Sequence, residues 1–150
     1  MKAMKKTGIR VTCLLSLLGC QLNEGRDETL VSELLNGFKE SVLAQDIDRF
    51  ASLFSDNHFN VQGTTRRNAR EVMTALMDSD ALYNLEIPIE EATTVMNDDG
   101  TATVFPVKVT GPNLNVTERL TLVKDAGSWL ISNIEIIEGH WQTVQTPASF

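Results

Sequence analysis

The sequence predicts an α+β fold in which helices cover one face of a curved antiparallel sheet, because its hydrophobic pattern changes once along the chain. Before Asp80 the apolar residues recur at helical spacing, and after Asp80 they alternate as they do in strands. Three turn signals, "NDDG", "TGPN" and "DAG", divide the second half into strand segments. Helices followed by a meander of strands are typical of this fold class.

Three helices are expected in the first half of the chain. The first covers residues 28–44 with Asp27 as its N-cap, and its apolar residues form one stripe. A second, shorter helix begins after Asp46. A third begins at Asn68, because Asn68 and Glu71 have the spacing of a capping box.

Five strand segments are expected, and the last four form the sheet. They are roughly residues 58–63, 82–95, 101–109, 114–124 and 129–137. If the loop at residues 110–113 places Val109 opposite Leu114, one face of the sheet carries apolar side chains and a single charge, Glu118. The apolar members of that face are Val109, Val107, Phe105, Leu114, Val116, Leu120 and Leu122.

The N-terminal twenty residues have the pattern of a secretory signal. Four basic residues precede a short apolar run at residues 11–19, which is far below the ~20 residues that a membrane-spanning helix needs. The stretch Leu17-Leu18-Gly19-Cys20 resembles the lipobox of bacterial lipoproteins, in which the cysteine is acylated and becomes the mature N-terminus. This resemblance implies a signal peptide at 1–19, a lipidated Cys20 with a tether at 20–26, and a domain at 27–150. The alternative is an ordinary signal peptide with an incidental cysteine.

The resemblance also implies a cellular location and excludes some chemistry. A lipidated Cys20 followed by Gln21 rather than aspartate implies anchoring on the periplasmic side of the outer membrane. Removal of residues 1–19 takes Cys13 away, so neither a disulfide nor a cysteine metal site is expected. It removes four of the thirteen Lys and Arg residues and none of the twenty acids, which makes the formal charge more negative than −7. Such an acidic domain is not expected to bind nucleic acid.

Two longer stretches resemble one superfamily. "LAQDIDRFASLFSDNHF" is similar to the helix–turn–helix–strand beginning of the nuclear transport factor 2-like superfamily, and "DAGSWLISNI" resembles its last hairpin. The likeness spans about residues 27–140 and implies a cone-shaped fold, with about three helices packed on the concave face of the sheet. Its members include isomerases, dehydratases, polyketide cyclases, transport adaptors and inert modules, so the resemblance does not select a function. Its proton-shifting enzymes usually carry an aspartate on the strand at 58–62, where this chain has no carboxylate.

Glu118 is the best candidate for chemistry. The expected register sets it opposite Phe105 among apolar side chains, where desolvation would raise the pKa of its carboxyl. Glu118 would then act as an acid or base, or hold a polar group of a ligand. The alternative is a position at the sheet rim or beside an arginine. A three-residue loop containing Gly127, which is favoured, pairs Glu118 with Ile134, and a four-residue loop would set it opposite Glu135.

Other polar candidates have ordinary alternatives. His58 is a candidate proton shuttle at the mouth of the cone, or a rim residue. No metal site or other cofactor is expected, because the two histidines lack acids at ligand spacing. Arg66, Arg67 and Arg70 at the start of the third helix would hold an anionic ligand or partner, or form a solvated basic turn.

Apolar residues predict a pocket and a partner surface. The pocket residues are Phe38, Phe54, Met73, Met77, Tyr83 and Phe105, which would fill a core instead if the cone is closed. The opposite sheet face is expected to carry Val104, Val123, Trp129 and Ile131, an apolar surface through which a homodimer would form.

Three functions remain open from the sequence. The first is a non-enzymatic, lipid-anchored module that binds a small apolar ligand or an envelope protein. The second is a small isomerase, dehydratase or cyclase that uses Glu118 as acid or base, with His58 assisting. The third is a structural dimer whose cone is filled by its own side chains. An enzyme needs Glu118 in a cavity that solvent reaches, a binder needs only the cavity, and the structural dimer needs neither.

Overall fold

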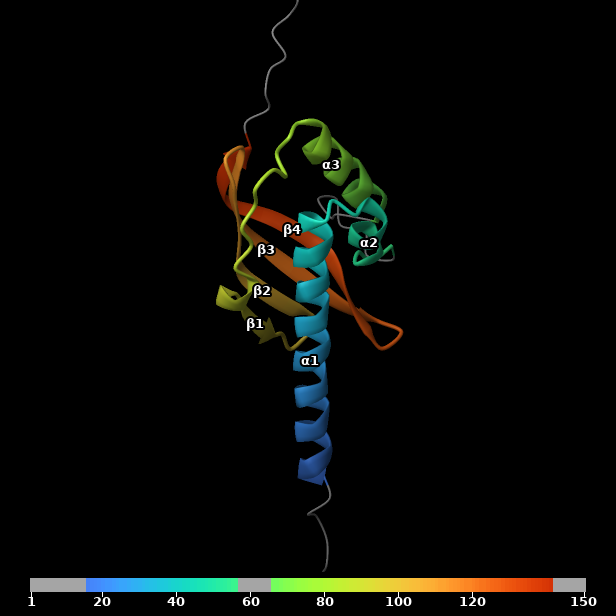
Figure 1. The fold of residues 1–150 in the computed structure, drawn as a ribbon. Coiled ribbons are helices and arrows are strands. Elements are labelled where there is room, and N and C mark those ends of the chain that lie inside the picture. The colour runs from blue at the N-terminus through green and yellow to red at the C-terminus, as the bar shows by residue number, and fades with distance from the viewer. Residues whose placement is uncertain (1–15, 57–65, 142–150) are drawn as a thin grey trace, which may run out of the picture.

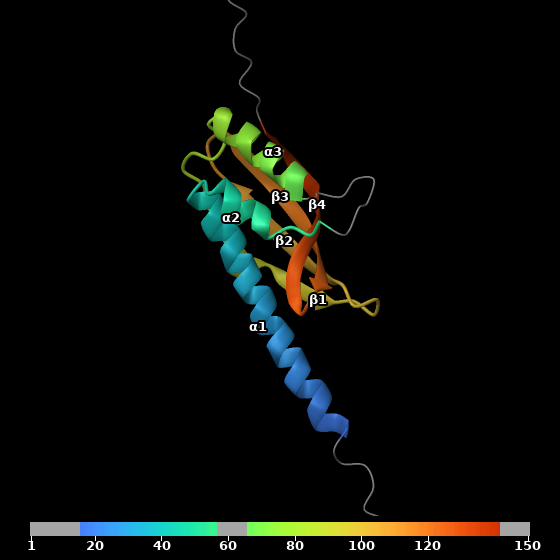
Figure 2. The ribbon, with the colours of Figure 1, turned by 90° about the vertical axis from the view of Figure 1, so that its right-hand side faces the viewer.

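The computed structural model describes residues 16–56 and 66–141 and has the expected α+β architecture (Figures 1 and 2). The helices are α1 Ser16–Leu43, α2 Ile47–Ser52, α3 Arg66–Asp78 and the short 3-10 helix η1 Ile89–Glu91. The strands are β1 Thr93–Met96, β2 Ala102–Thr110, β3 Leu114–Asp125 and β4 Ser128–Trp141, which lie in chain order in one antiparallel sheet. Helices pack on the concave face of this curved sheet, which confirms the predicted fold class.

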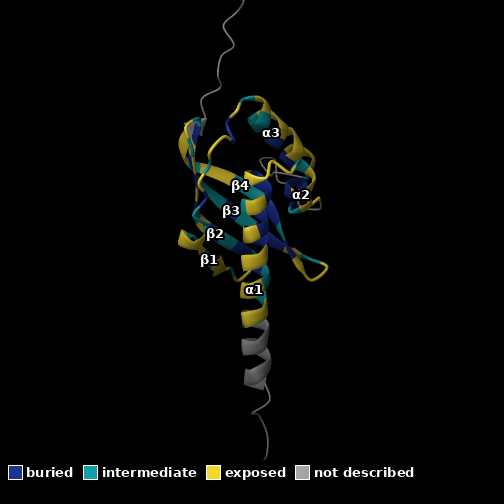
Figure 3. Cartoon of the chain, viewed as in Figure 1, coloured by how far each residue is buried: buried dark blue, intermediate teal, exposed yellow. Residues whose placement is uncertain are grey.

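α1 packs against the sheet through one apolar stripe and continues past the sheet at its N-terminal end (Figures 1 and 3). Its buried residues have helical spacing and include Val31, Leu34, Leu35, Phe38 and Val42. The N-cap expected at Asp27 is wrong, because no proline interrupts the residues before it and the helix begins at Ser16. Asp27 instead accepts hydrogen bonds from Lys124 Nζ at 2.6 Å and Trp129 Nε1 at 3.3 Å, which tie α1 to the β3–β4 hairpin.

The predicted start of α2 is confirmed, whereas the predicted start of α3 is wrong. The expected cap of α2 is confirmed, since Asp46 Oδ1 accepts a hydrogen bond from Arg49 N at 3.0 Å. The capping box of α3 is wrong, because α3 begins at Arg66 and therefore contains both Asn68 and Glu71. Arginine is a good helix former, which favours the earlier start. The strand expected at 58–63 lies outside the described residues.

The strand expected over residues 82–95 is wrong for most of its length. Only β1, at its end, pairs with β2, and the residues before β1 form η1 and an irregular connection. Pro88 lies in this connection and has no N–H to donate to a ladder. The connection meets the sheet at Glu86, whose backbone exchanges two hydrogen bonds with Thr110 at N···O distances of 2.7 and 3.0 Å.

The register between β2 and β3 also differs from the prediction. Val107 rather than Phe105 lies opposite Glu118, and a bulge falls between Val104 and Val107. Pro106 lies in the bulge and has no N–H for the ladder, which accounts for a break inside a central strand. The bulge turns Val104 into the core, where it is 0% exposed, and leaves Phe105 38% exposed on the other face.

The β3–β4 turn has two residues, 126–127, instead of the expected three or four. Their φ angles of 48° and 84° are typical of a type I′ hairpin turn. A bulge farther along this hairpin shifts the register by one residue. Glu118 therefore lies opposite Ile136 instead of the expected Ile134 or Glu135.

Candidate functional site

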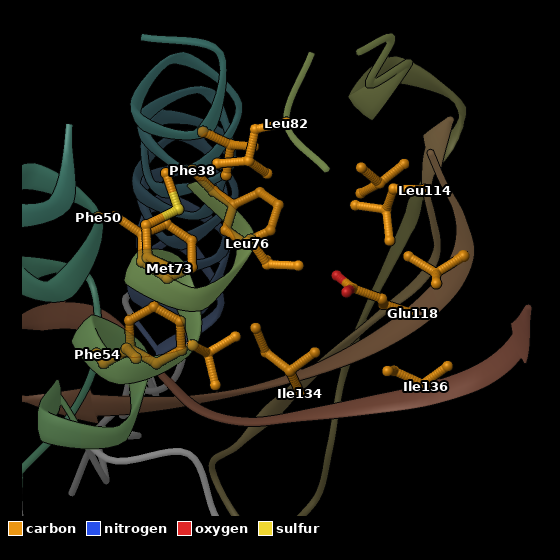
Figure 4. Close-up of a pocket in the computed structure, with 15 residues that line it drawn as sticks. Phe38, Phe50, Phe54, Met73, Leu76, Leu82, Leu114, Glu118, Ile134 and Ile136 are labelled. Atoms are coloured by element: carbon orange, nitrogen blue, oxygen red, sulfur yellow. The ribbon is translucent and has the colours of Figure 1, made fainter. Parts of the chain in front are cut away.

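A cavity of about 170 Å³ lies between the helices and the inner face of the sheet (Figure 4). Helices α1, α2 and α3 contribute one side of its wall, and strands β2, β3 and β4 contribute the other. The lining residues are Phe38, Val42, Phe50, Phe54, Ala69, Val72, Met73, Leu76, Leu82, Val109, Leu114, Val116, Glu118, Ile134 and Ile136. Glu118 is the only polar side chain in this described lining.

Three phenylalanines from α1 and the α2 region fix the helical side of the cavity. The ring centroids of Phe38 and Phe50 lie 5.7 Å apart, and those of Phe50 and Phe54 lie 5.0 Å apart. These separations are favourable for tilted aromatic pairs. Backbone hydrogen bonds then hold the end of this segment to β4, because Ile131 N donates to Leu53 O at 2.8 Å.

Glu118 points from the middle of β3 into the cavity (Figure 4). Its neighbours across the ladder are Val107 on β2 and Ile136 on β4, neither of which can form a side-chain hydrogen bond. Its Oε2 atom is shielded from solvent and accepts no hydrogen bond from the residues that the structure describes. Most buried polar side-chain atoms in proteins do have a partner, so an orphaned oxygen in a cavity indicates a place for a ligand group.

The surroundings of Glu118 make its carboxyl titrate near neutral pH. Burial raises the pKa of Glu118 from 4.5 to about 7, because an apolar environment disfavours the charged form. At neutral pH the same group can therefore donate a hydrogen bond as an acid or accept hydrogen bonds as a carboxylate. The apolar lining fixes the shape of the site, and Glu118 supplies the one titratable group of the described lining.

Comparisons with known proteins support the fold alone. No protein-family model matches the chain, and no curated protein matches it. A crystal structure of a de novo designed protein with a curved β-sheet is similar, with a TM-score of 0.50 and 13% identity over 71% of this chain and 97% of that chain. A Xanthomonas campestris crystal structure, described as a calcium/calmodulin dependent protein kinase II association domain, has a TM-score of 0.47 and 13% identity over 91% of this chain and 95% of its own.

Three of the six expected pocket residues line the cavity. Phe38, Phe54 and Met73 do so, whereas Met77 packs, partly buried, against the core beside the cavity. Tyr83 is 65% exposed, because its neighbour Leu82 takes the inward position. The expected place of Phe105 in the pocket is wrong because the β2 bulge turns it outward, where the Arg119 guanidinium lies 5.4 Å from its ring centroid.

The four residues expected on the outer sheet face are buried. Val104, Trp129 and Ile131 belong to the core on the inner side, so their expected exposure is wrong. The β2 bulge moves Val104 inward, and the short β3–β4 turn changes which β4 residues face the helices. Val123 alternates with inward Leu122 and is also buried, at 5% exposure.

The three arginines at the start of α3 all have acidic partners. Arg66 Nη1 lies 3.1 Å from Asp56 Oδ2, and Arg70 Nη1 lies 2.6 Å from Asp48 Oδ1. Arg67 pairs with an exposed glutamate one turn later in α3. None of the three lines the cavity, so a basic contribution to the site is not observed among the described residues.

Two expected site residues fall outside what the structure describes. His58 lies outside the described residues. Cys20 lies within α1, but its side chain is outside the described part. In the described ranges no group of three or more His, Cys, Asp or Glu residues is arranged to hold a metal ion. No helix in these ranges has both the length and the apolar composition needed to cross a membrane.

Several lining residues were not predicted as pocket residues. Phe50 and Leu76 belong to apolar stripes with helical spacing, so the sequence did indicate that their side chains point inward. Leu82 faces the cavity because of the irregular connection that follows α3, and Ile136 lies opposite Glu118 because of the bulge in the β3–β4 hairpin. A short apolar run gives no sign of either feature, and only the backbone geometry identifies these two residues.

Proposed function

We propose that this chain is a non-catalytic binding module that takes up one small, mainly apolar ligand beside Glu118. The cavity carries the proposal, because about 170 Å³ of apolar space surrounds a carboxyl whose Oε2 atom has no partner among the described residues. A cavity of ~150 Å³ lined by Leu, Ile and Phe is sufficient for benzene. The proposed ligand is therefore about the size of one substituted ring.

The proposed setting is the periplasmic side of a bacterial outer membrane, with the chain anchored by acylation of Cys20. The lipobox-like sequence supports the anchor, and the curved sheet with helices on one face supports membership of the nuclear transport factor 2-like superfamily. Mass spectrometry of the protein from its native host should find an acylated Cys20 as the mature N-terminus. An unmodified residue there would contradict the anchor. Binding of an envelope protein and homodimerisation through the sheet stay predictions.

Toluene tests whether the cavity accepts an apolar molecule. We expect toluene to raise the thermal unfolding temperature of the full chain and to shift the methyl NMR signals of Leu114, Val116 and Ile134, because it binds only the folded state. The variant Leu76→Trp adds volume at the lining and should weaken toluene binding at least about tenfold.

Leu43→Trp is the matched control, because Leu43 is 44% exposed on α1 and does not line the cavity. It should bind toluene as the wild type does. Absence of toluene binding to the wild type, or equal binding by wild type and Leu76→Trp, would contradict the proposed function.

A second candidate function is an enzyme that uses Glu118 for proton transfer. A pKa of about 7 for Glu118 favours it, since general acids and bases work best near the operating pH. The described lining supplies no second polar group to stabilise developing charge, which favours binding over catalysis. Incubation with 3-cyclohexenone in D₂O distinguishes the two, because deuterium incorporation that disappears in Glu118→Gln would establish the enzyme.

A further inference from the structure

We infer that the ligand is a small organic amine whose ammonium group pairs with the Glu118 carboxylate while its hydrocarbon frame fills the apolar cavity. The inference rests on the proposed function and adds the chemical class of the ligand. It starts from the Oε2 atom, which is buried, faces the cavity and has no hydrogen-bond partner among the described residues.

When Glu118 is ionised, the polar chemistry of the cavity favours a hydrogen-bond donor on the ligand. Glu118 is the only polar side chain of the described lining, and a carboxylate accepts hydrogen bonds but donates none. A ketone or an ether only accepts, so it would leave an ionised Glu118 unpaired. An anionic ligand would place two like charges in the same apolar space. Ligands with an N–H or O–H donor remain for the ionised form, and amines and alcohols are the simplest of them.

An ammonium group fits this site better than a hydroxyl group. Either group would form a charge-assisted hydrogen bond with the Glu118 carboxylate, but only the ammonium also neutralises its buried charge. The formal net charge of −7 also favours the approach of a cation. The three arginines that begin α3 do not oppose it, because each is already paired with an acidic side chain and lies outside the lining.

The amine should bind with a characteristic pH dependence. Within residues 16–56 and 66–141, the side chains that lie opposite Glu118 or line the cavity around it are apolar, for example Val107 on β2, Ile136 on β4, Phe38 on α1 and Leu76 on α3. Among the described residues, Glu118 is therefore the group whose ionisation a change in amine affinity reports. Because burial raises the pKa of Glu118 to about 7, the affinity should rise about tenfold from about pH 6 to about pH 8.

Benzylamine and benzyl alcohol test the inference, because they have the same size and differ in the group that meets Glu118. Their affinities for the full chain are measured by isothermal titration calorimetry at about pH 6 and about pH 8. We expect benzylamine to bind at least about tenfold more tightly than benzyl alcohol at the higher pH, with a smaller difference at the lower pH. Glu118→Gln should remove this preference, whereas Glu138→Gln on β4 should preserve it.

Each result decides a different claim. Benzyl alcohol binding as tightly as benzylamine at the higher pH would overturn the amine inference and leave the proposed function standing. A benzylamine affinity that does not change with pH would overturn the pairing with Glu118. Both comparisons use the wild-type chain, so they decide the inference even if Glu118→Gln does not fold. No binding of toluene, benzylamine or benzyl alcohol would overturn both the inference and the proposed function.

Discussion

Glu118→Gln should gain stability relative to the wild type as the pH rises, by about 3 kcal/mol in total. The folded wild type holds the Glu118 proton with a pKa of about 7, whereas the unfolded chain releases it near 4.5. Between these two values the folded state binds more protons, so its free energy of unfolding falls as the pH rises. The penalty is absent below about pH 4.5 and complete above about pH 7. Glutamine does not titrate, so the variant does not lose this stability as the pH rises.

Urea denaturation of the full chains from about pH 4 to about pH 8 measures this difference. At each pH, the free energy of unfolding of the wild type is subtracted from that of the variant. The change of this difference with pH is then compared with the prediction, because any constant effect of the amide group cancels. Glu138→Gln controls for the loss of a glutamate from the same hairpin, because Glu138 is exposed on β4. Stability curves of wild type and Glu118→Gln that run parallel over the whole range would contradict the burial of this carboxyl.

Gly139→Ala should lower the free energy of unfolding by at least about 3 kcal/mol, because positive φ and steric overlap act together. Gly139 has a φ of 102°, a region that residues with a Cβ rarely adopt. A Cβ there would overlap Asn115 O and lie 2.8 Å from Val116 Cα, both of them backbone atoms of β3. Relieving this overlap would push β4 away from β3 beside Val116, which lines the cavity.

Gly100→Ala separates the two causes, since Gly100 has a φ of 83° but open space where its Cβ would lie. It should cost about 1 kcal/mol, which is the effect of positive φ alone. Both variants are compared with the wild type by urea denaturation of the full chain. Equal losses for the two glycines would show that close approach of β3 and β4 at Gly139 does not contribute.

The sequence was sufficient for the architecture because each half of the chain has its own hydrophobic period. The α1 stripe and the inward residues of β3 follow that period closely, and Asp46 marks the start of α2 as its side chain requires. Between Leu82 and β1 apolar residues alternate with others, as in a strand, but this backbone pairs with the sheet only at Glu86, so the pattern resembles a strand without forming one. The apolar side chains there are buried by tertiary contact, and a local hydrophobic pattern does not distinguish such burial from strand pairing.

The candidate site was predicted in one respect and missed in another. Glu118 interrupts an apolar face, and alternation alone placed it inward whichever register was chosen. The residues predicted opposite Glu118 were wrong, because bulges in β2 and β4 shift the strand pairing. Pro106 gives a physical reason for the bulge in β2. No described residue accounts for the bulge in β4. Periodicity also identifies which side chains face inward but not whether they fill the space. The cavity itself therefore had no signal in the sequence.

An unpaired carboxyl inside an apolar cavity is tested most directly by ¹³C NMR titration of the Glu118 side chain in the full chain. The Glu118→Gln variant assigns the signal by its absence. Burial without a partner predicts a titration midpoint of about 7 for the wild type. A midpoint near 4.5 would place the carboxyl in water or beside a cation, and the proposed binding site would lose its anchor.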